Sequence, residues 1–95
     1  MELTRENIEE IVKETIEKVT PTVTATAFNK DSKILVKIVL SSGVSIERTR
    51  EMSEWMQRKI TNDLHLRSGQ VVVIPSVTGV FDVDIMVLSN EEDKK

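Results

Sequence analysis

The sequence predicts an α+β fold, a two-layer sandwich in which two helices cover one face of a four-stranded antiparallel sheet. Two segments carry apolar residues at the 3.6-residue period of an amphipathic helix, and four segments alternate with the period of two that is typical of a strand. These segments follow one another in the order α-β-β-α-β-β. Placing both helices on the same face of the sheet is the simplest way to bury both apolar stripes.

The first helix is expected directly after Thr4, whose short hydroxyl side chain is typical of a helix N-cap. Leu3 and Ile8 have the spacing of a hydrophobic staple across that cap. Pro21 ends the helix, because the residue before a proline avoids the α conformation. One face carries the apolar stripe, made by Ile8, Ile11, Val12, Thr15, Ile16 and Val19.

Two strands are expected next, over residues 22–28 and 33–40. In the first strand Ala25 and Ala27 share one face, while threonines occupy the other. The second strand is apolar on both faces, which is typical of a strand in the centre of a sheet. Residues 29–31, with the sequence Asn-Lys-Asp, supply the turn between the two strands.

The second helix is expected over residues 45–66, with Ser45 as its cap and Gly69 as a left-handed residue after its end. Its sheet-facing side follows from a rotation of about 100° per residue. The residues that cluster on this side are Ile46, Thr49, Ser53, Met56, Ile60 and Leu64.

The last two strands are expected over residues 70–74 and 80–88, joined by a hairpin loop over residues 75–79. Pro75 cannot donate to a β-ladder, so the third strand is placed at an edge of the sheet. The second and fourth strands are then central, as in a ferredoxin-like unit whose chain is circularly permuted. We expect a single domain over residues 1–90 and a charged, flexible tail over residues 91–95.

Composition argues against most chemical functions. The chain has a net charge of −3, no cysteine and one histidine, His65. A phosphate-binding surface usually needs a basic surplus, and a metal site needs several His, Cys or acidic ligands. Asp82 and Asp84 lie two residues apart on one face of a strand, where pairing with Lys37 is expected. We therefore expect no enzyme activity and no catalytic, cofactor or metal site.

Apolar residues are expected on the face of the central strands that the helices leave open. Leu35, Val39, Met86 and Leu88 fall on this face. Such a patch often marks a partner site. A second candidate contact is the flank of the second helix that carries Met52 and Trp55, although Trp55 could instead fold into the groove between the helices.

The expected function is a small non-enzymatic interaction or assembly module, with a second copy of itself or another protein as its partner. An alternative is an RNA-binding module that uses the arginines of the second helix. Five basic residues of this helix region are interleaved with four acidic ones, which favours a salt-bridged surface and makes a nucleic-acid partner the weaker prediction. An apolar run of about 18 residues is lacking, so we expect no membrane insertion and a cytoplasmic location.

One stretch resembles a known family. Gly43 and Ile46 open the second helix, Gly69 follows it, and Val71 and Val73 alternate in a strand that leads to Gly79-Val80. Over residues 33–80 this pattern is similar to the alkaline-shock-protein family of small cytoplasmic domains. The resemblance implies a non-catalytic protein that self-associates or organises partners at the cell envelope.

Overall fold

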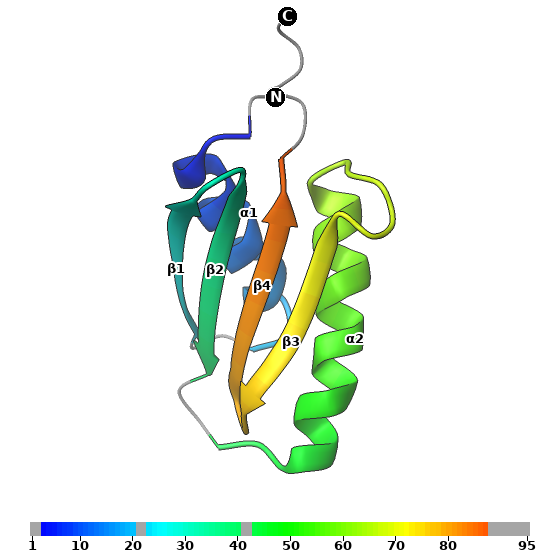
Figure 1. Cartoon of the computed structure of the whole chain (residues 1–95). Coiled ribbons are helices and arrows are strands. Elements are labelled where there is room, and N and C mark those ends of the chain that lie inside the picture. The colour runs from blue at the N-terminus through cyan, green and yellow to red at the C-terminus, as the bar shows by residue number, and fades with distance from the viewer. Residues whose placement is uncertain (1–2, 21–22, 41–42, 88–95) are drawn as a thin grey trace, which may run out of the picture.

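The structure, a computed structural model, describes residues 3–20, 23–40 and 43–87. Both helices lie on one side of a four-stranded sheet (Figure 1), and the predicted order α-β-β-α-β-β is confirmed. The elements are α1 (Arg5–Glu17), β1 (Val23–Lys30), β2 (Lys33–Leu40), α2 (Ile46–Asp63), β3 (Val71–Val77) and β4 (Val80–Met86).

The strands are arranged in the order β1-β2-β4-β3, and every neighbouring pair is antiparallel. β2 and β4 are therefore central and β3 is an edge strand, as the sequence predicts. The chain passes from β2 through α2 to β3 and then returns through β4, which lies between β2 and β3. This strand order is the one expected for a permuted ferredoxin-like unit.

The hydrophobic core lies between the sheet and the helices. β2 alternates strictly, with Ile34, Val36, Ile38 and Leu40 buried beneath the helices. Because successive strand residues point to opposite faces, the other half of each strand is left for the open side. The remaining large core side chains come from β3, β4, the two helices and the residue that caps α2: Val71, Val73, Phe81, Val83, Ile85, Ile8, Val12, Ile16, Met52, Met56, Ile60 and Leu64.

The start of α1 agrees with the prediction and its end differs. The side-chain oxygen of Thr4 accepts a hydrogen bond of 3.1 Å from the amide of Asn7, and Leu3 packs against the core. The helix ends at Glu17, so the placement of Val19 on the apolar stripe is wrong. Val19 is 49% exposed, because the chain has left the helical path before reaching it. Pro21 lies outside the described residues.

α2 also begins where the sequence predicts, with the Ser45 hydroxyl accepting from the amide of Arg48 at 3.0 Å. Two of its side chains are placed differently. Ile46, at the first position of the helix, is not buried against the sheet and is 65% exposed. Met52 is buried in the core, since it lies between Thr49 and Met56 on the apolar side, and so it is not available as a flank contact.

α2 ends three residues earlier than predicted, and its left-handed residue is His65. The amide of His65 donates to the carbonyl of Asn62, and the amide of Leu66 donates to that of Thr61, both at 3.0 Å. This pair of bonds is a Schellman motif, which satisfies carbonyls that the helix end leaves without partners. Gly69, with φ +97°, turns the loop that follows.

The strand boundaries differ from the predicted ones at the hairpins. β1 continues to Lys30, and Asp31, with φ +56°, opens a shorter turn. β3 continues through Pro75 to Val77, where a loop was expected. An edge strand tolerates proline because the missing N–H faces away from the sheet, and the register shifts between Pro75 and Val77. β4 ends at Met86.

Replacing His65 with glycine should raise the free energy of unfolding by about 0.5–1 kcal/mol. A left-handed conformation is strained for a residue with a Cβ, and this gain exceeds the added entropy of glycine in the unfolded chain. Urea denaturation of the variant and the wild type measures the difference. As a control, Gly69→Ala should lower stability, because it places a Cβ on a backbone with φ +97°. A destabilised His65→Gly protein would contradict this account of the helix end.

Candidate functional site

The candidate site is the face of the sheet that points away from both helices, which we call the open face. Figure 1 views the molecule from this side, with the helices behind the strands. The register aligns its side chains in rows that cross all four strands. Two of these rows run in the order β1, β2, β4, β3 as Phe28, Leu35, Asp84, Val72 and as Thr26, Lys37, Asp82, Ile74.

Large apolar side chains are exposed on the open face, mainly towards its two edges. Phe28 on β1 is 52% exposed, and Ile74 on β3 is 53% exposed. Val72 is exposed beside Ile74, and Val39 and Met86 are exposed on the central strands. Several exposed apolar side chains on one face are typical of a site that contacts another molecule.

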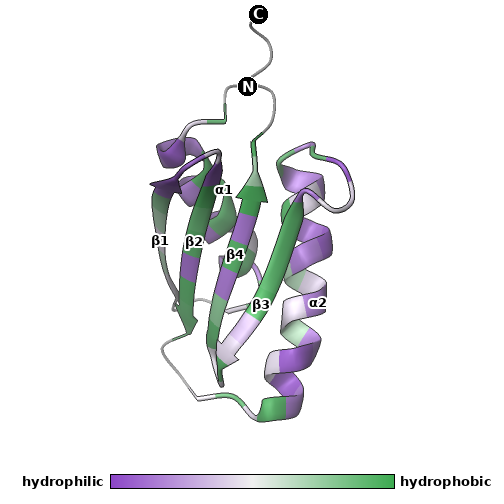
Figure 2. Cartoon of the chain, in the orientation of Figure 1, coloured by the Kyte–Doolittle hydropathy of each residue, from purple (hydrophilic) through white to green (hydrophobic). Residues whose placement is uncertain are grey.

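Charged side chains cross the centre of the open face. The ammonium Nζ of Lys37 lies 3.7 Å from Oδ1 of Asp82, its direct neighbour on β4, so the predicted pairing is confirmed. Nζ of Lys33 lies 3.5 Å from Oδ2 of Asp84. In Figure 2 hydrophilic bands alternate with hydrophobic segments along β2 and β4. The lysines stand on β2 and the aspartates on β4, so the two central strands carry opposite charge.

The sequence located part of this surface. Val39 and Met86 are exposed on it, whereas Leu35 is partly buried between its neighbours. Leu88 lies outside the described residues. Trp55 is partly buried against the core.

Sequence reasoning missed the most exposed apolar residues of the face. Phe28, Val72 and Ile74 are not among the predicted contacts, because the prediction is restricted to the central strands and α2. The alternation of Val72 and Ile74 with the buried Val71 and Val73 was the available signal.

Helix side chains occupy the outer edge of β1. The amide of Ala27 donates to Oε2 of Glu9 at 2.8 Å, and its carbonyl accepts from Nη1 of Arg5 at 3.4 Å. Both groups of Ala27 point away from β2, and an added strand would need them. α1 therefore blocks strand pairing at this position.

A similar arrangement protects the outer edge of β3. The amide of Val73 donates to Oε1 of Gln57 on α2 at 3.0 Å. Two residues further along, Pro75 has no N–H to offer. An incoming strand thus finds no free donor at either position. These edge positions are therefore poorly suited to pairing with an added strand.

Removing the helix side chains that occupy the edges should destabilise the fold. Glu9→Ala or Gln57→Ala should each lower the free energy of unfolding by about 1 kcal/mol, because an amide loses its acceptor. Hydrogen exchange at Ala27 and Val73, respectively, should become faster. Glu9→Gln and Gln57→Glu keep an acceptor and should restore most of the protection. Glu10→Ala, at an exposed neighbouring position on α1, is the control. Unchanged exchange in the alanine variants would contradict this role.

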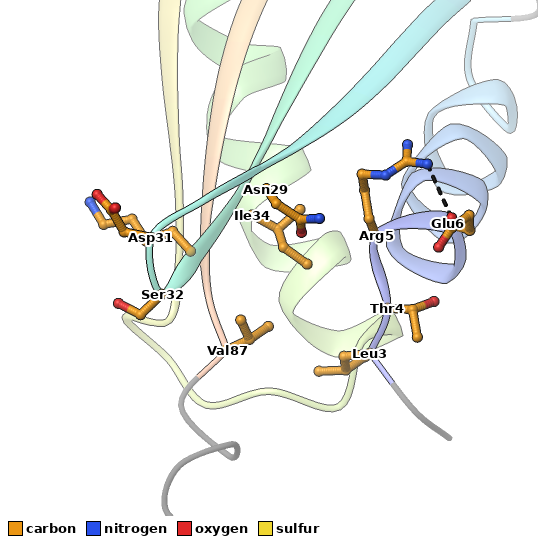
Figure 3. A pocket seen from close by; sticks show the side chains of 10 residues that line it. Leu3, Thr4, Arg5, Glu6, Asn29, Asp31, Ser32, Ile34 and Val87 are labelled. Carbon is orange, nitrogen blue, oxygen red and sulfur yellow. Dashed lines mark hydrogen bonds and ion pairs between the residues drawn. The ribbon is translucent and has the colours of Figure 1, made fainter.

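A second feature is an open pocket of about 560 Å³ between the start of α1 and the β1–β2 turn (Figure 3). Arg5 and Lys33 both line it. The guanidinium of Arg5 pairs with the Glu6 carboxylate at 3.1 Å, and Lys33 pairs with Asp84. Because both cations already have acidic partners, this pocket is a weaker candidate for binding an anion than the open face is for binding a protein.

The basic residues of the α2 region lie on a surface of mixed charge. Arg48, Arg50, Arg58, Lys59 and Arg67 are all exposed, as are Glu47, Glu51 and Glu54. Arg48 pairs with Glu51 at 3.5 Å, one turn along the helix. This arrangement is typical of a salt-bridged helix face and differs from a continuous basic track along a phosphate backbone. Within the described part of the chain, no three His or acidic side chains gather into a metal-binding group.

No family model, curated protein or solved structure matches the chain. The relationship to the alkaline-shock-protein family therefore stays a prediction from the sequence pattern. Over residues 3–20, 23–40 and 43–87, no helix is both long and apolar enough to cross a bilayer.

Proposed function

We propose that this chain is a non-enzymatic protein–protein interaction module, acting as a homo-oligomer or complex subunit, and that the open face is its contact surface. The observation that carries the proposal is the exposure of Phe28, Val72 and Ile74 on a sheet face that neither helix covers. Burying apolar side chains releases about 25 cal/mol for each Å² removed from water. A cytoplasmic location belongs to the same proposal.

The dimensions of the open face indicate the strength of the contact. Four strands about 4.8 Å apart, each about seven residues long, span a face of about 19 by 23 Å. Covering two such faces against each other removes on the order of 1,000 Å² from water, which is at the low end for specific interfaces. A single contact of this size, interrupted by charges, is expected to have a dissociation constant in the micromolar range.

The charged centre of the face adds orientation to this apolar contact. Lys37 and Asp82 are each about half exposed, so both retain surface for a partner's opposite charge. Charge complementarity contributes mainly to specificity and to the rate of association. The apolar flanks supply the attraction, and the charged centre determines which orientation is favourable.

Sedimentation equilibrium tests the proposal. The apparent mass of the wild-type protein should rise above the monomer value of 10.8 kDa as concentration increases. An oligomer should predominate at several hundred micromolar. The double variant Val72→Lys with Ile74→Lys should sediment as a folded monomer, because it introduces two unpaired charges into the contact. Ile46→Lys is the matched control: the same kind of change at an exposed apolar residue outside the open face should leave association unchanged. A wild-type mass of 10.8 kDa at every concentration would contradict self-association.

A further inference from the structure

We infer that the partner on the open face is a second copy of this chain, packed face to face about a twofold axis that runs parallel to the strands between β2 and β4. This inference rests on the proposed function and specifies the partner and its orientation. It follows from how charge and apolar area are distributed across the four strands.

The central strands of the open face are oppositely charged. β2 contributes Lys33 and Lys37, and β4 contributes Asp82 and Asp84. Each lysine is within 4 Å of an aspartate of the same chain, and each side chain remains between about one third and one half exposed. The face is therefore divided lengthwise into a basic half and an acidic half, with the boundary between β2 and β4.

Two sheets that pack face to face keep their strands roughly aligned. A twofold axis lying in the interface can then run parallel or perpendicular to the strands. The parallel axis exchanges β2 and β4, so Lys37 of one copy faces Asp82 of the other copy, twice in the dimer. The perpendicular axis places β2 over β2 and brings like charges together. The charge pattern selects the parallel axis, because like charges facing each other are strongly unfavourable.

The same axis brings the apolar edges of the face together. Phe28 and Val72 lie in one row but on opposite edge strands, separated by Leu35 and Asp84. Within a single chain they are too far apart to cover each other. The parallel axis places β1 of one copy over β3 of the other, so Phe28 packs against the other copy's Val72. A single twofold axis therefore pairs opposite charges at the centre of the face and covers the exposed apolar side chains at its edges.

Charge reversal tests the orientation. Lys37→Asp should weaken dimerisation at least about tenfold, because two attractive contacts become repulsive. Asp82→Lys should do the same, and the double variant Lys37→Asp with Asp82→Lys should restore wild-type affinity. Lys59→Asp makes the same charge change at an exposed position on α2 and should have little effect. Circular dichroism on dilute, monomeric samples establishes that each variant is folded.

Mixing the two single variants separates contacts between chains from those within a chain. Each single variant retains its internal repulsion in the mixture, but its residues 37 and 82 face opposite charges on the other variant. Heterodimers should therefore form at protein concentrations at which each variant alone remains monomeric. If Lys37→Asp behaves like Lys59→Asp while the Val72 and Ile74 double variant dissociates, this orientation is overturned and the proposed surface stands. A monomeric wild-type protein would overturn the second copy as the partner, and a different protein would remain as the partner of the proposed surface.

Discussion

Burial of one face of β2 and β4 beneath two helices is the constraint on which the rest of the molecule depends. The alternate residues of these strands form the centre of the core, with Phe81, Val83 and Ile85 fully buried. Two helices cover only one side of a four-stranded sheet. The opposite side must therefore either be compatible with water or be covered by another molecule.

The open face combines both solutions. Lysine–aspartate pairs make its centre polar, so this part of the face is compatible with water in an isolated chain. Its flanks carry exposed apolar side chains, which are more stable when another molecule covers them. The outer edges of β1 and β3 differ from the open face, because Glu9 and Gln57 already accept hydrogen bonds from amides of these strands. Strand addition is therefore disfavoured at these two edge positions, and the open face remains as the proposed contact surface.

The fold was predictable because local pattern and tertiary burial agree in most elements. The strict alternation in β2 and the caps Thr4 and Ser45 are determined by residues close in sequence. The predicted boundaries are wrong where an element's end depends on contacts with residues distant in sequence. Pro75 stops a strand in isolation, but the ladder with β4 carries β3 past it. The end of α2 is a different case, because its local hydrogen bonds require a left-handed His65, a conformation that this residue type does not indicate.

The candidate site was predictable only in part for the same reason. Periodicity identifies which residues share a face of one strand, and this was sufficient for Val39 and Met86. It does not give the register between strands. The row that places Phe28, Leu35, Asp84 and Val72 side by side, and the separation of charge between β2 and β4, exist only after pairing of segments that are distant in sequence.

One junction in the fold bears on the order in which the chain assembles. The buried amide of Gly79 donates to the hydroxyl of Thr49 at 3.2 Å, while the carbonyl of Gly79 accepts from the amide of Leu40 at 2.9 Å. This junction joins the end of β2, the first turns of α2 and the β3–β4 turn. It closes a loop of about forty residues, which costs more chain entropy than the short β1–β2 hairpin does. We expect the hairpin to form early and this junction to form late, so the slow step of folding is the docking of β4 beside β2.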